Sequence, residues 1–209
     1  MKSRVKRLFV WIVSLTLITI VVGLVGLRLL WQPIDGTATN SSDPAGFNVP
    51  EVDTTQEQES EVIEGPEDRT LKVTIPAMAR VDNATVPDAD GDDEEALGGH
   101  AAIHLKGTGF PWQEEANVYL AGHRLGYPGT DSFLGFWDLD NLQGGDEIYV
   151  EDADGEEYIY KVFRSFVVDP TDLSVVETVP GRNVMTLQTC TLPDYSERLI
   201  VQAELIDEV

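Results

Sequence analysis

The sequence predicts an all-β fold, a closed or nearly closed barrel of about seven or eight short strands, behind an N-terminal transmembrane helix. Three observations support this prediction: one long apolar run near the N-terminus, many short apolar or alternating runs after it, and little helical periodicity. The 209-residue chain therefore divides into a basic tail with a membrane anchor (1–31), a polar and acidic linker (32–68) and a folded domain (69–209).

The predicted anchor begins with four basic side chains in residues 2–7, followed by an apolar run over 8–31. A helix of about 20 apolar residues spans a bilayer, whereas the apolar core of a signal peptide is only about 7–15 residues long. The run ends in Arg-Leu-Leu-Trp (28–31) rather than in a small-residue cleavage site. We expect an uncleaved single-pass anchor, with a cytoplasmic N-terminus and an extracellular remainder.

Charge is divided unevenly along the chain. Residues 1–31 hold five of the 14 Lys and Arg residues and no Asp or Glu, so the remainder carries nine basic and 37 acidic residues, a net charge of −28. Such an acidic surface disfavours nucleic acid and anionic lipid as partners. Residues 32–68 are polar and cannot bury enough apolar surface to fold alone, so we expect a flexible stalk there.

Short runs predict the strands of the folded domain, because each is apolar or alternates between apolar and polar residues: 71–75, 117–121, 184–189 and 199–205. Two further runs, 146–151 and 157–162, flank turn residues at 152–155 and predict a hairpin. Residues 132–142 are the one helical candidate of note. Many short strands with few helices favour a barrel.

The candidate site begins with Cys190, the one cysteine of the chain. Outside the cell a lone thiol is either reactive, paired with another molecule, or a small buried apolar residue. Cys190 ends one predicted strand, Arg198 begins the next, and His123 ends another, so we expect all three at one rim of the barrel. A thiol, an acid/base and a cation are what acyl transfer through a thioester needs. Arg198 and the amide of Thr191 are the candidate oxyanion donors.

Four segments resemble the sortase family. Residues 186–201 resemble its signature, T-L-x-T-C followed after a short loop by Arg and an apolar strand. Residues 117–124, N-V-Y-L-A-G-H-R, resemble the family's histidine segment. Residues 139–148 and 168–172 are similar to its L-x-x-L-x-x-G-D-x-I and V-x-P-x-D stretches. The four occur in the family's order and cover nearly all of residues 71–206.

The resemblance implies an eight-stranded sortase-type barrel and a cysteine transpeptidase of the Gram-positive cell wall. Such an enzyme cleaves a secreted protein's C-terminal L-P-x-T-G-type signal between Thr and Gly, and an amine on a peptidoglycan precursor or a pilin lysine resolves the thioacyl intermediate. By this resemblance Cys190 is the nucleophile, His123 is the acid/base, and Arg198 holds the substrate and stabilises the oxyanion.

Within the family, the A-G-H-R and T-L-x-T-C motifs of an acidic, N-terminally anchored chain look most like class E, which is associated with L-A-x-T-G signals. Two departures fall where the signal should lie: Gly-Phe-Pro-Trp (109–112) replaces H-Y-P, and Thr-Cys-Thr-Leu-Pro (189–193) replaces T-C-H-P. The second residue of the signal therefore stays open. Residues 43–45 do not form an aspartate-aromatic lid and no apolar tail precedes Val209, which favours anchoring over pilus polymerisation.

Other candidate sites are weaker. His100 and His104 have a spacing that suits metal ligands on a helix, but glycines on both sides disfavour a helix. The acidic run 88–95 has its glycine at the fourth position rather than at the sixth position of an EF-hand loop, so a solvated loop is favoured over a calcium site. We expect no cofactor. Arg124 either lies at the surface or helps to position the site, and the surface is the favoured alternative.

Two rival functions remain at this point. One is an extracellular cysteine peptidase whose thioester is resolved by water. The other is a non-catalytic domain that binds peptides at the barrel rim. An arginine rather than Asn or Asp in the third role favours the transpeptidase over the peptidase.

Overall fold

Nine β-strands form one sheet in the computed structural model, which describes residues 65–208. The sheet order is β2-β1-β6-β7-β9-β8-β5-β4-β3. The bounds of the strands are β1 Leu71–Thr74, β2 Ala84–Val86, β3 Asp88–Ala89, β4 Ile103–Leu105, β5 Ala116–Ala121, β6 Glu147–Glu151, β7 Glu157–Val168, β8 Asn183–Cys190 and β9 Arg198–Glu208. Three short helices accompany them: α2 Glu94–Gly99, η1 Leu139–Asn141 and η2 Leu173–Val176.

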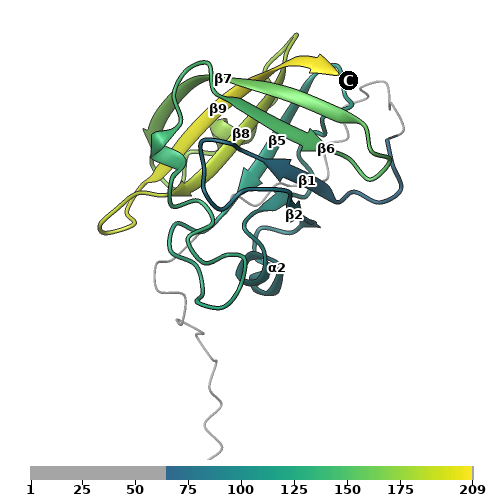
Figure 1. The fold of residues 1–209 in the computed structure, drawn as a ribbon. Coiled ribbons are helices and arrows are strands. Elements are labelled where there is room, and N and C mark those ends of the chain that lie inside the picture. Colours follow the sequence, from purple (N-terminus) through teal and green to yellow (C-terminus); the bar gives the residue numbers. More distant parts are fainter. Residues whose placement is uncertain (1–64, 209) are drawn as a thin grey trace, which may run out of the picture. The chain divides into compact units, whose positions relative to one another are not determined.

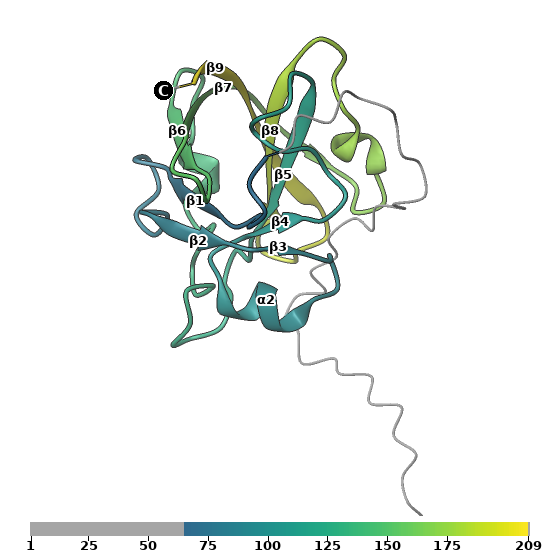
Figure 2. The same ribbon diagram turned by 90° about the vertical axis from the view of Figure 1, so that its right-hand side faces the viewer.

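The sheet curls into a nearly closed barrel (Figures 1 and 2). Its two edge strands, β2 and β3, are consecutive in sequence and are separated by Pro87 alone, so the two edges of the sheet meet at that residue. Most neighbouring strands are antiparallel, but β5 pairs with β8 in parallel, as β3 does with β4. The β5–β8 pairing becomes important for the site, because it places the carboxyl ends of both strands at one rim.

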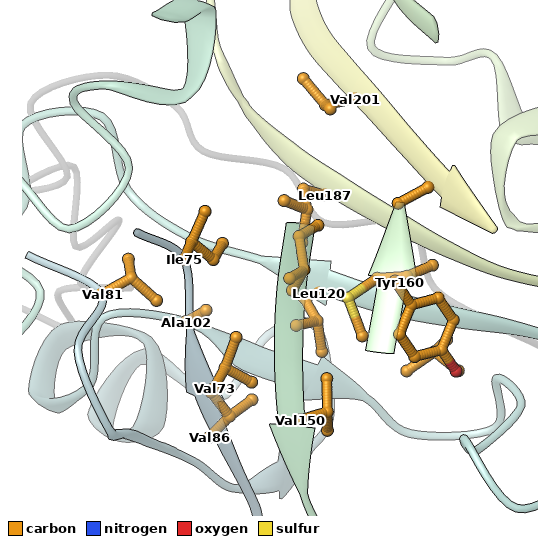
Figure 3. Close-up of a cluster of buried hydrophobic side chains, with 14 of the residues drawn as sticks. Val73, Ile75, Val81, Val86, Ala102, Leu120, Val150, Tyr160, Leu187 and Val201 are labelled. Carbon is orange, nitrogen blue, oxygen red and sulfur yellow. The ribbon is translucent and has the colours of Figure 1, made fainter. Parts of the chain in front are cut away.

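The barrel interior is filled by apolar side chains that alternate along the strands (Figure 3). Val118 and Leu120 of β5, Leu187 of β8 and Val201 of β9 point into this core. Because successive side chains of a strand point to opposite faces, the residues between them lie on the outside of the barrel. This core provides the hydrophobic burial that holds the strands in register.

Most of the strand predictions are confirmed. The runs at 71–75, 117–121, 184–189 and 199–205 correspond to β1, β5, β8 and β9. The predicted hairpin is the antiparallel pair β6–β7. In its turn, Gly155 has a φ of 87°, and the Asp152 carboxylate accepts from the amides of Asp154 and Glu156.

The predicted strand number is corrected from eight to nine. The pair β3–β4 is short: Asp88 pairs with His104 and Ala89 with Leu105. The amide of Lys106 donates to the carbonyl of Ala89 over 2.9 Å, which extends this ladder. Two-residue strands are too short for a periodicity to be read from sequence.

The predicted helix over 132–142 is wrong, apart from the short turn η1. Leu134 has a φ of 59°, outside the helical region, and its amide donates to the carbonyl of Leu125. Gly135 lies so close to Ala101 that an added Cβ would be 2.8 Å from the Ala101 carbonyl oxygen. The α-helix of the domain is instead α2, where the Asp93 carboxylate caps the amide of Ala96.

Within residues 65–208, no helix is both long enough and apolar enough to cross a bilayer. The predicted anchor, 1–31, and residues 32–64 of the predicted linker lie outside the described residues.

Candidate functional site

Cys190 and Arg198 face each other across the β8–β9 ladder. They are the last register pair of the two antiparallel strands, and each is only 2% exposed. The connection between them is closed by Thr191 and Glu197: the Thr191 amide donates to the Glu197 carbonyl over 3.0 Å, and the Glu197 amide donates to Thr191 Oγ1 over 3.2 Å. The prediction that both residues lie at the same rim is confirmed.

His123 lies at the same rim because of the parallel pairing of β5 with β8. Ala121 is in register with Gln188, and the next amide, that of Gly122, donates to the Gln188 carbonyl over 3.0 Å. Thr189 Oγ1 donates in turn to the Gly122 carbonyl over 2.7 Å. Counted two residues beyond the last register pair, the same alignment places His123 level with Cys190 at this rim. The His123 side chain is 8% exposed.

The backbone of His123 is held from its other side by the connection that follows it. The amide of Phe136 donates to the His123 carbonyl over 3.1 Å. The preceding residue, Gly122, has no room for a side chain, since an added Cβ would be 2.6 Å from the Ala101 carbonyl oxygen and 2.8 Å from the Phe136 ring. The ring of Tyr127 meets the His123 imidazole edge-on, with centroids 5.5 Å apart and an interplanar angle of 89°. These contacts fix the histidine at the rim.

The prediction that Arg124 lies at the surface is wrong, because it is only 7% exposed. Its guanidinium donates to Asp140 over 2.6 Å and lies 5.7 Å from the centre of the Trp137 ring. Its Nε is buried without a hydrogen-bond partner. Asp140, whose side chain is 55% exposed, and the Trp137 ring partner the buried guanidinium, since a cation beside a carboxylate and an aromatic ring tolerates burial better than a lone charge. The ion pair ties η1 to the residue after His123.

The Arg198 guanidinium is held by the β8–β9 connection. Its NH1 donates to the carbonyls of Tyr195 and Glu197, each over 3.1 Å. On its other side Arg198 is in register with Val168, the last residue of β7. Hydrogen bonds from Thr171 hold the pKa of the nearby Asp169 carboxyl below its ordinary value, and the charge of Arg198 adds to this lowering. A fixed cation beside a thiol favours the thiolate.

The predicted role of the Thr191 amide as an oxyanion donor is not supported. This amide already donates to the Glu197 carbonyl. The turn between β8 and β9 uses this amide to close the connection. Residue spacing in the sequence does not indicate this hydrogen bond. Of the two predicted oxyanion donors, Arg198 alone stays a prediction.

Cys190 belongs to a second apolar cluster, on the outside of the barrel. We use "outer face" for the side of β5, β8 and β9 that carries Cys190, namely Asn117, Tyr119 and Ala121, Thr186, Gln188 and Cys190, and Arg198, Ile200 and Gln202. Val175 of η2 packs in the same cluster, with Val176 partly buried against it. The η2 segment thus packs on the outer face, in the same apolar cluster as the thiol.

Tyr119 and Gln188 are polar residues of this face that the sequence analysis missed. Tyr119 is fully buried and its hydroxyl donates to Gln188 Oε1. Burial raises the pKa of the Tyr119 phenol, and the positive charge of Arg198 opposes that shift. The sequence signal was present, because polar residues alternate with apolar ones along both strands.

The candidate metal ligands are engaged in other contacts. His100 follows α2 and its Nδ1 contacts the Ala96 carbonyl, whereas His104 lies in β4 with Nδ1 2.8 Å from Asp88 Oδ1 and Nε2 2.9 Å from the Gly109 carbonyl. The two histidines do not share a helix, as the flanking glycines indicated. In the part of the chain that the structure describes, no three His, Cys, Asp or Glu side chains gather as a metal site.

This chain is similar to known proteins in sequence and in structure. The family model described as the sortase domain matches residues 73–206. Sortase A of Streptococcus agalactiae serotype III (strain NEM316) is 36% identical over 90 residues, which is 43% of this chain and 36% of that relative. The matched segment thus spans about a third of the length of this curated relative.

Solved structures are similar over most of the described domain. Sortase A from Corynebacterium diphtheriae gives a TM-score of 0.56 at 28% identity, covering 66% of this chain and 61% of that one. Sortase C1 of GBS pilus island 1 gives 0.58 at 31% identity, covering 69% of each chain. A Clostridium perfringens sortase D5 transpeptidase gives 0.55 at 26% identity, covering 67% of this chain and 80% of that one.

Proposed function

This chain belongs to the sortase family, and from that premise we propose that it is a cysteine transpeptidase acting on an L-A-x-T-G or L-P-x-T-G sorting signal. The observation that carries the proposal is the meeting of Cys190, Arg198 and His123 at one rim of the barrel. A buried thiol beside a permanent cation and next to an imidazole is suited to acyl transfer.

In the proposed reaction, Cys190 Sγ attacks the carbonyl carbon of the signal's threonine, and Arg198 stabilises the oxyanion that forms. The bond between Thr and Gly then breaks, with the leaving amine taking a proton from His123 and the threonine held as a thioester on Cys190. An incoming amine loses its proton to His123 and attacks the thioester. Release of the thiolate then completes the transfer to the amine.

The proposed partners are secreted proteins that carry the signal at their C-terminus and an amine on a peptidoglycan precursor, with a pilin lysine as the second choice. The anchor proposed for residues 1–31 would place the catalytic domain outside the cell membrane. The class E assignment stays part of the proposal, supported by the motifs A-G-H-R and T-L-Q-T-C. The second residue of the signal is to be decided by experiment.

We propose that the reaction needs no metal or cofactor. Several carboxylates of the acidic run 88–95 already have partners: Asp88 contacts His104, Asp93 caps α2, and Asp90 lies 3.5 Å from Lys106. These contacts support a structural role for the run. Activity is therefore expected to be the same with EDTA as with added calcium.

The test uses the detergent-solubilised full chain with reporter peptides containing L-A-x-T-G or L-P-x-T-G, with and without triglycine. Mass spectrometry follows the products, and Cys190→Ala is the matched control. Cleavage after threonine with an amine adduct, absent from the control, is the expected result.

Other outcomes of this experiment favour the rivals. Cleavage with water as the acceptor, at any amine concentration, would indicate a peptidase. Peptide binding that survives Cys190→Ala, without cleavage or an acyl adduct in the unaltered chain, would indicate a binding domain.

A further inference from the structure

The backbone of His123 belongs to a small closed ring of contacts. The Phe136 amide donates to the His123 carbonyl over 3.1 Å, and this hydrogen bond is the first bridge of the ring. The second bridge is made by side chains, because Arg124 NH2 donates to Asp140 Oδ2 over 2.6 Å. His123 and Arg124 are neighbours in sequence, and Asp140 follows Phe136 by four positions. A ring this small leaves the backbone of the histidine little freedom.

The side of the ring that carries Asp140 is fixed in the barrel core. Phe136, Leu139 and Leu142 all belong to the core cluster, and none is more than 5% exposed. The Leu139 amide donates to the Phe136 carbonyl over 3.3 Å, and the Leu142 amide donates to the Leu139 carbonyl over 3.4 Å. Asp140 therefore lies on a segment that is embedded in the core before and after it. Such a rigid support lets a carboxylate hold its partner in one place.

Arg124 is a costly residue if its only role is to stabilise the fold. Its side chain is 7% exposed, and its Nε is buried without a hydrogen-bond partner. A desolvated charge and an unpaired buried N–H both cost free energy, and a buried ion pair often adds nothing to stability. An apolar side chain of similar length would fill the same space without either cost. Stability is therefore a poor explanation for a charge at this position.

We propose that Arg124 is a positioning residue for the transpeptidation, whose ion pair with Asp140 holds the backbone of His123 and so keeps the imidazole aligned with Cys190. The inference deepens the proposed function and rests on it for the reaction. Arg124 acts through the backbone that it shares with His123. Misplacement of a reacting group by about 1 Å can lower a rate about 10²-fold.

The variant Arg124→Met separates positioning from stability. Methionine has a similar length and no charge, so it removes the bridge and the unpaired N–H together. The carboxylate left behind is that of Asp140, which is 55% exposed and can be solvated by water. We expect the urea midpoint of the full chain to stay close to that of the unaltered chain. In the same variant kcat for the reporter peptide should fall roughly 10–100-fold, with KM nearly unchanged.

The variant Arg124→Lys is the matched rescue. Arg124 donates to Asp140 through NH2, and a lysine ammonium supplies both a donor and the same charge. We expect Arg124→Lys to recover most of the kcat that Arg124→Met loses. A purely steric role of the side chain would instead make methionine and lysine equivalent.

The chain offers a control pair of the same kind away from the rim. Arg182 donates to Glu204 over 2.6 Å, and its guanidinium lies 4.5 Å from the centre of the Phe163 ring. The Arg182 carbonyl accepts from the amide of Ala116, the first residue of β5, whereas His123 lies beyond the last residue of that strand. Arg182→Met therefore removes an ion pair and a cation–π contact at the opposite end of β5, and it should leave kcat unchanged.

A direct readout of the imidazole needs no turnover. The chain has three histidines, so few imidazole signals arise in NMR spectra of the histidine-labelled full chain, and His123→Gln assigns one of them. We expect Arg124→Met to shift and broaden the His123 signal. The signal of His104, which is held by Asp88 and Gly109, should stay unchanged.

The variant Asp140→Asn keeps the test valid if Arg124→Met fails to fold. It removes the charge and keeps the shape of the side chain. Asp138→Asn is its control, because Asp138 Oδ1 accepts from Asn141 Nδ2 rather than from Arg124. We expect Asp140→Asn to change kcat and the His123 signal in the same direction as Arg124→Met, and Asp138→Asn to change neither.

Three results would overturn the proposal. The first is a His123 signal that is unchanged in both Arg124→Met and Asp140→Asn. The second is a loss of kcat in Arg182→Met as large as that in Arg124→Met. The third is a lower urea midpoint in Arg124→Met with unchanged kcat per folded molecule. If the unaltered chain processes no reporter peptide while the His123 signal responds as expected, the proposed function fails and the hold of Arg124 on His123 stands.

Discussion

The inner and outer faces of β5 and β8 are equally buried and chemically different. Both strands are buried at every position. In the middle of the strands the inner face carries Val118, Leu120, Met185 and Leu187, all within the barrel core. The outer face carries Asn117, Tyr119, Thr186, Gln188 and Cys190. Burial alone therefore does not separate the residues that hold the barrel together from those that build the site.

The difference arises from what covers each face. The inner face packs against side chains from the other strands of the barrel, so apolar residues are sufficient to fill it. On the outer face, Asn117 Nδ2 donates to the carbonyls of Val175 and Glu177, because buried carbonyls require polar donors. Substitutions on the inner face should therefore change stability, and those on the outer face and its rim should change chemistry.

Among substitutions that keep the Cys190 thiol, the largest expected effect on chemistry is that of His123→Gln. Loss of an acid/base lowers catalysis by about 10²–10⁴-fold, so kcat for reporter cleavage should fall by that range. The urea midpoint should stay close to that of the unaltered chain, because His123 lies at the rim outside both apolar clusters. A large loss of stability with normal kcat per folded molecule would contradict the division of the two faces.

The converse change is Leu187→Ala on the inner face. Truncation of a fully buried leucine lowers the free energy of unfolding by about 2–5 kcal/mol, from lost burial and the cavity left behind. Urea denaturation measures this loss. Reporter kinetics well below the unfolding midpoint should keep kcat/KM per folded molecule within about threefold, since Leu187 packs in the barrel core and Cys190 lies on the opposite face of the strand. A folded but inactive variant would show that the inner face also shapes the site.

Arg198→Lys sharpens the comparison, because it keeps the charge on the outer face and removes the planar fork. A lysine cannot hold the carbonyls of Tyr195 and Glu197 as Arg198 does and still present a donor to the oxyanion. We expect kcat/KM for the reporter peptide to fall about 10²-fold. Undiminished kcat/KM would mean that Arg198 contributes its charge alone.

The smallest effect is expected at the ion pair between Arg182 and Glu204, whose side chains are 34% and 42% exposed. Hydrogen bonds from Arg182 hold the pKa of the Glu204 carboxyl below its usual value of 4.5. A depressed carboxyl pKa stabilises the fold above the unfolded value, and this contribution is lost as pH falls through the folded value.

Glu204→Gln should therefore cost about 0.2–1 kcal/mol at pH 7. The difference from the unaltered chain should disappear in acid, below the ordinary range of a glutamate. Urea denaturation at several pH values measures it. A cost that persists at low pH would show that the side chain acts by packing.

Much of the barrel and the three rim residues could be predicted from the sequence. Alternation located β1, β5, β8 and β9 because each has a continuous apolar face. The positions of Cys190 and Arg198 followed because an antiparallel turn brings strand ends together. The place of His123 at the same rim could also be predicted. The parallel pairing of β5 with β8, which brings His123 there, could not, since local sequence does not encode which strand a strand pairs with.

Features that depend on tertiary contacts could not be predicted. The positive φ of Leu134 is set by pairing with Leu125, which overrides the helical pattern of 132–142. The burial of Arg124 depends on Asp140. The hydrogen bond from Asn117 to the Val175 carbonyl joins residues far apart in sequence. Each involves a partner that sequence spacing does not identify.

The parallel alignment of β5 with β8 has a consequence for how such proteins diversify. His123 follows the carboxyl end of β5 and Cys190 ends the adjacent parallel strand β8, so their distance in space is set by strand pairing and not by the length of chain between them. The connection 169–182 can then be exchanged for one of another length or composition without moving the reactive pair. Chimeras that carry a connection of another length from relatives would test whether the reactive pair is independent of the chain between its members.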